Sequence, residues 1–332
     1  MHPSGARSRA GFVGPESALL RRRAAWLGGI AVLLLVPVFI RQPYHITICV
    51  NLFITIMLTL SMNFVVGFSG QWSFAHAAFF GAGAYIPAIL TTKLGVSPWL
   101  GFPIGVVCVV GVATLVGVPI VRLRGYYLAV CTLALGLLTE VFVRQATDIT
   151  GGGYGIQRIP PLELFGTPLR AAAYYPIAFA GVALTGLLLS NLMRSPLGHA
   201  IIATRDNPEA ASAAGIDVAR MKLFAFVLAA GLAGSAGWIH AFYYLGLDGS
   251  ILTTDRAFLW MFMVFIGGLG RPAGVVLGTV FLVLAPELLG FFAQNQVLWV
   301  GILMLAVALF APRGFASVLD AAVLRFRPEG RS

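Results

Sequence analysis

Charged residues are scarce in this sequence. Only 10% of its 332 residues are Asp, Glu, Lys or Arg, whereas 59% are hydrophobic, and the mean hydropathy is +0.90. Soluble domains carry about 25% charged residues, so the composition excludes an ordinary soluble fold and predicts an integral membrane protein. Glycine, by contrast, is abundant at 39 residues, as in helices that pack closely in lipid.

Cysteine and lysine are also rare, and their scarcity excludes several functions. The three cysteines, Cys49, Cys108 and Cys131, lie in apolar segments without CxxC or Cys/His spacing, so we expect inert thiols and neither disulfides nor metal. Lys93 and Lys222 are the only lysines, and no G-x-x-x-x-G-K-[ST] phosphate-binding loop occurs. We therefore expect no cofactor and no enzymatic activity, with any ATP hydrolysis carried out on partner subunits.

There are ten apolar segments, and all but the eighth have the length that crosses a bilayer core, roughly 17–25 residues. They are 24–40, 44–66, 73–92, 98–121, 126–146, 171–193, 222–245, 257–270, 272–292 and 296–312. The eighth is short enough to be tilted or re-entrant. No alternation of the kind found in outer-membrane barrels occurs. The sequence predicts an all-α polytopic bundle of about ten transmembrane helices.

Basic residues indicate how this bundle is oriented. If the N-terminus is cytoplasmic and all ten segments cross, 16 of the 22 Lys and Arg residues face the cytoplasm, as the positive-inside rule expects. We predict a multi-pass protein of the bacterial inner membrane with both termini cytoplasmic. Its parts are a disordered tail (1–23), one membrane domain (24–312) with a long cytoplasmic loop (194–221), and a C-terminal tail (313–332).

That loop contains the polar passage RDNPEAASAAGID, residues 205–217. Asn207 suits a helix N-cap, Pro208 the first helical position and Glu209 the positive helix end. The alanines that follow favour a helix, which Gly215 can terminate. The product is a helix of about two turns, roughly 10 Å long. Its small side chains, including Ala210 and Ala211, suit insertion into a groove on another protein, although an ordinary connector between spans is the alternative.

Polar groups at membrane depth are costly and need a reason. Four of them cluster around a glycine-containing break between the second and third segments, namely Asn63, Gln71, Ser73 and His76. Broken backbone at this depth is tolerated where it is buried in protein or lines a wet cavity. The cluster is therefore a candidate for the translocation path or its gate, with hydrogen bonding at a tight turn as the alternative.

Two carboxylates carry a rival hypothesis. Glu140 and Glu287 are predicted in the outer halves of the fifth and ninth segments, where they could line a cavity or couple transport to an ion gradient. Small residues also recur every fourth position, at 73, 77 and 81 and again at 270, 274 and 278. Such seams predict close helix packing, and one of them could form a contact between subunits.

Several motifs resemble one known family. EAASAAG (209–215) is similar to the E-A-A-x-x-x-G loop with which permeases of ATP-binding-cassette (ABC) importers dock on their ATPases. SMNFVVGFSGQWSFAHAAFFGAGAY (61–85), RLRGYYLAVCTLALG (122–136), TGGGYGI (150–156) and GGLGRPAGVVLG (267–278) have counterparts, in the same order, in branched-chain amino-acid permeases of the LivM type. The resemblance covers about residues 45 to 315.

This resemblance implies a fold, partners and a substrate. The fold would be like the ten-helix permease of the cobalamin importer. The partners would be a second, LivH-like permease, two ABC ATPases and a periplasmic or extracellular solute-binding protein. The cargo would be leucine, isoleucine or valine, while urea, short amides and other amino acids are carried by related systems. The coupling residues would be Asn207, Pro208, Glu209, Ala210, Ala211 and Gly215. The rival is a secondary transporter or channel driven by an ion gradient.

Overall fold

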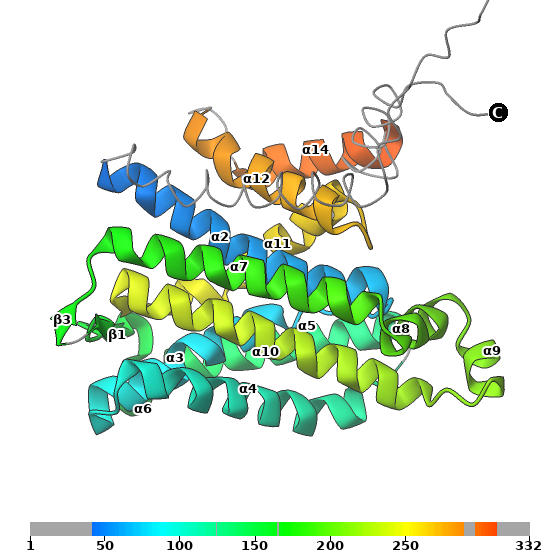
Figure 1. The fold of residues 1–332 in the computed structure, drawn as a ribbon, viewed down its shortest axis with the longest axis horizontal. Helices are drawn as coiled ribbons and strands as arrows, with labels where there is room; N and C mark the ends of the chain where they lie inside the picture. The colour runs from blue at the N-terminus through cyan, green and yellow to red at the C-terminus, as the bar shows by residue number, and fades with distance from the viewer. Residues whose placement is uncertain (1–41, 124, 165, 289–295, 311–332) are drawn as a thin grey trace, which may run out of the picture.

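The chain is almost entirely helical (Figure 1). The structure, a computed structural model, describes residues 42–123, 125–164, 166–288 and 296–310, so the predicted first span and both tails lie outside it. The long helices are α2 (Pro43–Asn63), α3 (His76–Leu94), α4 (Pro98–Ile120), α5 (Tyr126–Gln145), α7 (Ala171–Met193), α10 (Val218–Tyr244), α11 (Thr254–Gly267), α12 (Pro272–Leu288) and α14 (Gln296–Phe310). The shorter elements are the π-helix η1 (Phe64–Phe68), α6 (Thr147–Thr150), η2 (Gly152–Tyr154), β1 (Ile156–Gln157), β2 (Glu163–Leu164), β3 (Thr167–Pro168), α8 (Pro196–Asp206), α9 (Pro208–Ala213), β4 (Gly246–Leu247) and η3 (Gly249–Leu252).

Six of the described helices are long and apolar enough to cross a membrane. They are α2 with η1, α3, α4, α5, α7 and α10. Within the described residues, helices α11, α12 and α14 have 14, 17 and 15 residues and are shorter than these six. An all-helical membrane protein is therefore confirmed. The count of ten spans stays a prediction.

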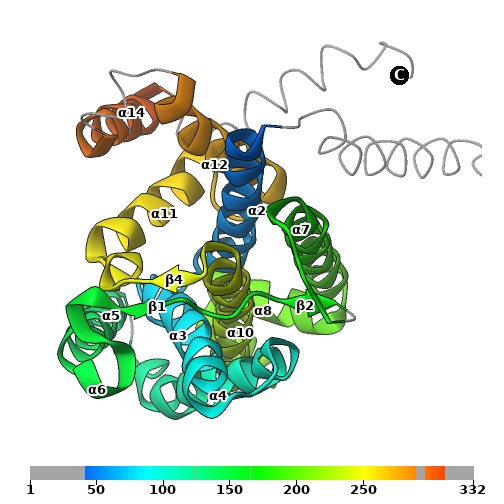
Figure 2. The same ribbon diagram turned by 90° about the vertical axis from the view of Figure 1, so that its left-hand side faces the viewer.

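Helices α2 and α10 occupy the centre of the bundle (Figure 2). In its most apolar 18-residue stretch, α2 is 78% buried, against 17% for the peripheral helices α5 and α7. Helix α10 contacts α2, α3, α4 and α7, and α2 also packs against α11 and α12. The outer faces of α4, α5 and α7 therefore remain apolar and exposed, as expected of surfaces that meet lipid or another membrane subunit.

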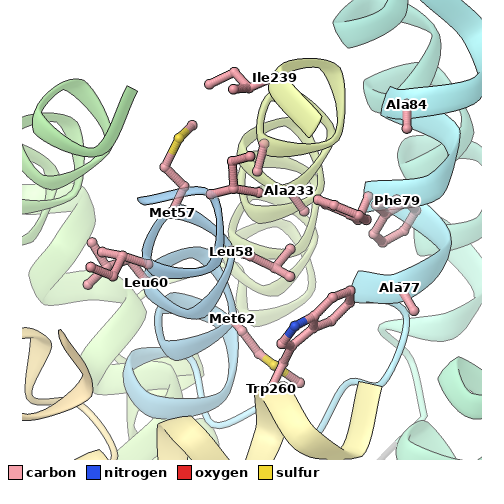
Figure 3. Close-up of a cluster of buried hydrophobic side chains, with 14 of the residues drawn as sticks. Met57, Leu58, Leu60, Met62, Ala77, Phe79, Ala84, Ala233, Ile239 and Trp260 are labelled. Carbon is pink, nitrogen blue, oxygen red and sulfur yellow. The ribbon is translucent and has the colours of Figure 1, made fainter. Parts of the chain in front are cut away.

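The core lies where α2, α3, α10 and α11 meet (Figure 3). Leu58 of α2 points toward Phe79 of α3 in this cluster, and Met62 lies beside Trp260 of α11. Met57 points to the other side of α2, where its sulfur packs on Gly181 of α7. The Trp260 ring packs on Phe80 at 5.3 Å between centroids, and Phe79 packs on Phe226 of α10 at the same distance. These aromatic contacts join helices that are far apart in the sequence.

Small residues set the closest helix crossings. A Cβ atom at Gly83 of α3 would overlap the backbone of Gly234, and one at Gly237 of α10 would overlap that of Phe80. The predicted seam at 73, 77 and 81 was wrong as a helix–helix contact, because α3 begins only at His76 and Gly81 faces η3 rather than a neighbouring helix.

The second predicted seam holds two helices of this chain together. A Cβ atom at Gly278 of α12 would come within 2.8 Å of the amide nitrogen of Gly267 in α11. Its contact therefore lies within the chain. In addition, the hydroxyls of Thr59 and Thr279 are hydrogen-bonded at 2.9 Å, which joins α2 to α12.

The two ends of the bundle differ (Figure 1). Helices α8 and α9 lie at one end, and α6, β1 and β3 lie at the opposite end. At the latter, β1 pairs antiparallel with β4, with Ile156 opposite Leu247, and β2 pairs with β3. The connection from β4 to α11 is more than a surface loop, because Ile251 and Leu252 are buried and Leu252 packs on Gly81 of α3.

Candidate functional site

Helix α9 forms where the sequence predicts it. The Asn207 side chain accepts hydrogen bonds from the backbone N–H groups of Glu209 and Ala210, at 3.1 and 3.0 Å, as an N-cap does. Gly215 has φ +85°, the left-handed conformation that ends a helix. Because an isolated helix this short is only marginally stable in water, we attribute the stability of α9 to these caps and to the packing of its buried Ala211.

The remaining side chains of α9 point outward. Glu209, Ala210, Ser212 and Ala213 are exposed, whereas Ala211 is buried against the protein. The predicted small-faced protrusion is therefore present, with one of its alanines serving as the anchor. Next to it lies a groove of about 590 Å³, lined by Arg194, Pro196, His199, Ala200, Ala203 and Ile216.

Helix α8 was missed by the sequence reasoning, which treated 194–206 as loop. Ser195 caps it by accepting from the N–H of Gly198 at 3.4 Å, and Pro196 occupies its first turn. A Ser-Pro pair is a recognisable helix start and could have revealed this helix. Ile201 and Thr204 are fully buried, so α8 is fixed to the bundle immediately before α9.

The glycine-containing break begins in η1. This π-helix extends α2, and Gly70 then adopts φ +68°. π-Helical turns are rare in proteins, and those that occur are often found at functional sites. The buried Asn63 side-chain oxygen accepts from the N–H of Gly270 at 2.9 Å, which ties the break to the turn between α11 and α12.

The other predicted residues near the break are also buried. Gln71 donates from its amide nitrogen to the hydroxyl of Ser69 at 2.6 Å and to the backbone carbonyl of Lys222 at 3.0 Å. The hydroxyl of Ser73 accepts from the N–H of Ala75 at 3.3 Å. These contacts match the hydrogen-bonding alternative for the cluster.

His76 differs from its neighbours. It begins α3, is 1% exposed, and the Ser61 backbone faces its ring. Within the described part of the chain, neither ring nitrogen has a hydrogen-bond partner of ordinary geometry. A buried polar group without a partner is uncommon; the Oε1 atom of Gln71 shares this feature, but among the four residues only in His76 do all the side-chain polar atoms lack a partner in the described part of the chain.

The two carboxylates do not form a common site. Glu140 pairs with Arg144 one turn along α5, at 3.0 Å, while Glu287 is exposed on α12 and accepts from the hydroxyl of Tyr44. Helix α11 lies between α5 and α12 and contacts both (Figure 2). The carboxylates therefore have separate surroundings and separate partners.

The strand end carries a few exposed charges. Hydrogen bonds from Ser250, first from its hydroxyl and then from its backbone N–H, lower the pKa of Asp248, and Arg256 nearby adds to this effect. The aliphatic part of Arg144 lies beside Gly249. Charged groups of both signs thus gather where β4 leads into η3.

Comparison with known proteins places these features in a family. Residues 44–312 match the family described as "Branched-chain amino acid transport system / permease component". The chain is 31% identical over 285 residues to the "High-affinity branched-chain amino acid transport system permease protein LivM" of Escherichia coli (strain K12), a match that covers 79% of this chain and 67% of that protein.

Two proteins from Methanocaldococcus jannaschii are also similar. The "Probable branched-chain amino acid transport permease protein LivM" is 24% identical over 249 residues, covering 70% of this chain and 68% of the relative. The corresponding protein LivH is 25% identical over 290 residues, covering 81% and 89%. No solved structure matches the chain. The family match over most of the described residues, joined to an all-helical membrane fold, shows that this chain belongs to the branched-chain amino acid permease family.

Proposed function

We propose that this chain is one permease subunit of an ABC importer, and that α9 is the surface on which an ATPase docks. The single observation that carries the proposal is the geometry of α9. It is capped at both ends, anchored through Ala211, exposed at Glu209, Ala210, Ser212 and Ala213, and located at the end of the bundle opposite the paired strands (Figure 1). Its sequence fits the E-A-A-x-x-x-G pattern of importer permeases.

The groove beside α9 supports the same assignment. The protruding α9 helix and the groove lined by His199, Ala203 and Ile216 form an uneven surface, to which a partner of complementary shape can bind. Arg194 adds a positive charge to the lining of this groove, and Glu209 adds an exposed negative charge on α9. The ATPase would be recognised through both shape and charge.

The mechanism that follows is alternating access driven from outside the chain. Closure of two ATPases around ATP would move the α9 helices of two permeases, and the spans around a shared path would reorient. The second permease would be LivH-like, since relatives of this chain carry both names. The proposed gate residues are Asn63, Gln71, Ser73 and His76, with Glu140 and Glu287 as further candidates for the path.

The cargo and its delivery are inferred from the relatives. Their names point to branched-chain amino acids, while urea or short amides are the alternative within the same class. A solute-binding protein would deliver this cargo at the strand end, where β1 and β4 pair and charges of both signs are exposed. The chain would thus take its specificity from that partner.

We also propose an arrangement of this chain in the membrane. The α9 end faces the cytoplasm, both termini are cytoplasmic, and the domain 24–312 with its coupling loop 194–221 adopts a ten-helix fold like that of the cobalamin importer. Six apolar helices of spanning length and the shorter helices α11, α12 and α14 are compatible with this arrangement.

Reconstitution tests the proposed function. We expect vesicles that contain both permeases, both ATPases and the binding protein to take up leucine only when ATP is present on the side of the membrane where the ATPases are bound. Removing the ATPases should lower uptake to background, and an ionophore that dissipates proton and sodium gradients should leave ATP-driven uptake unchanged. Uptake that continues without ATPases and stops with the ionophore would instead support the gradient-driven carrier.

A further inference from the structure

Arg205 connects the end of α8 to the glycine-containing break. It lies in the last turn of α8, three residues before Pro208 begins α9, and its Nη1 donates to the backbone carbonyl of Gly67 at 2.5 Å. The two residues are 138 positions apart in the sequence. We propose, on the basis of the proposed function, that Arg205 is the positioning residue that transmits movement of α9 to the break and so couples ATP hydrolysis to transport.

The acceptor is suited to a cation. The Gly67 carbonyl belongs to η1, at the C-terminal end of the α2–η1 helix, where the backbone carbonyl groups carry partial negative charge. A guanidinium keeps its charge at all relevant pH values and holds its donors in a rigid plane. Its hydrogen bond therefore resists the separation of α8 from η1 better than a neutral side chain would.

Glycines create the space for this side chain. A Cβ atom at Gly70 would lie 2.8 Å from Cγ of Arg205, and one at Gly270 would lie 3.5 Å from its Nη1. Only the contact at Gly70 is too close for a side chain, so the absence of a Cβ atom there leaves room for Arg205, whose side chain is 43% exposed and whose Nε lies 3.8 Å from the carboxylate of Asp206. We call Arg205, Gly67, Gly70 and Gly270 the arginine slot.

The other flank of α9 is attached to the same break. The backbone carbonyl of Lys222, in the first turns of α10, accepts from Gln71 at 3.0 Å. Residues 205 and 222 bracket α9, and their contacts meet at residues 67 and 71. A displacement of α9 consequently acts on the break from both sides.

The slot also reaches helices beyond the break. Asn63 binds the N–H of Gly270 in the turn between α11 and α12, and a Cβ atom at Gly67 would overlap both of these groups. Movement of Arg205 would therefore displace the break and, through it, the ends of α2, α3, α11 and α12. The π-turn that these hydrogen bonds join to α8 and to the α11–α12 turn is therefore the element that we propose changes its packing during transport.

Arg205→Gln in the assembled importer tests the proposal, with Arg122→Gln as its control. Arg122 is exposed at the end of α4 and makes no contact with the arginine slot. We expect Arg205→Gln to retain its ATPase partners and their hydrolysis, while the amount of leucine moved per ATP falls about tenfold. Arg205→Lys should recover part of this loss because it keeps the charge. Arg122→Gln should match the unmodified protein.

A second pair of variants reaches the same slot without removing the arginine. Gly70→Ala brings its methyl group onto Arg205, whereas Gly95→Ala introduces an alanine at nearly the same φ, +66° against +68°, with no atom within 4 Å. Since both variants carry the same backbone strain, a lower coupling ratio in Gly70→Ala alone would arise from the displaced arginine.

The outcomes are distinguishable from a failure of the proposed function. If the unmodified importer shows no ATP-dependent uptake, the proposed function itself is wrong. If it does, and both Arg205→Gln and Gly70→Ala move as much leucine per ATP as their controls, the transmission role is overturned. Failure of both variants to accumulate as folded protein would also overturn it, because Arg205 would then serve folding.

Discussion

Glu209→Lys is expected to abolish ATP-driven uptake and to release the ATPases from the membrane complex. The substitution reverses a charge at the N-terminal end of α9. The favourable interaction of a carboxylate with the positive end of a helix, which is lost here, contributes only about 0.3–1 kcal/mol to helix stability. That loss is too small to unfold a membrane domain, so the defect must arise at the docking surface. Co-purification of ATPase with the tagged permease and uptake in vesicles measure the two effects.

Gly215→Val should have the same result through the backbone. At φ +85° a β-branched residue is strained by at least about 1–2 kcal/mol, so the end of α9 would change its course. Both variants should insert normally and keep the second permease, which serves as the internal control. Wild-type uptake by both, with the ATPases still bound, would contradict the docking role of α9.

The second large effect is expected at the crossing of α3 and α10. Gly83→Val and Gly237→Val would force branched side chains into the backbone of the facing helix, at Gly234 and Phe80 respectively. Overpacking typically costs about 1–3 kcal/mol, and here the obstruction is backbone, which no rotamer change can relieve. We therefore expect each variant to lose at least this much stability and to be recovered poorly.

Gly111→Val in α4 is the matched control for this pair. It introduces the same side chain into a membrane helix, but no atom lies within 4 Å of the added Cβ atom. Thermal unfolding of the purified permease in detergent compares the three proteins. Equal midpoints for Gly83→Val and Gly111→Val would mean that α3 and α10 do not cross as closely as described.

Much of the fold could be predicted from the sequence. Apolar segments located α2, α4, α5 and α7 within a few residues, because a bilayer requires helices of a certain length and proline marks several of their first turns. The start and end of α9 were also predictable, since the Asn-Pro pair and Gly215 act locally. Local chemistry of this kind needs no knowledge of the tertiary structure.

The tertiary contacts of the site could not be predicted in the same way. Arg205 reads as one more cytoplasmic charge until α8 is seen to place it beside Gly67. Leu252 reads as part of an outer loop until the pairing of β1 with β4 turns the following residues inward onto Gly81. Both depend on how distant helices are aligned, and apolar composition alone does not determine that alignment.

The most direct test of the account is a crosslink from α9 in the assembled importer. A single cysteine at the exposed Ser212, with Cys49, Cys108 and Cys131 replaced by alanine, would carry a photoactivated probe. We expect the Ser212 probe to form an adduct with the ATPase, and the same probe at Tyr154, which is 91% exposed at the end of η2 just before β1, to form none with it. An adduct of the Ser212 probe with the solute-binding protein, or an ATPase adduct from Tyr154 alone, would contradict it.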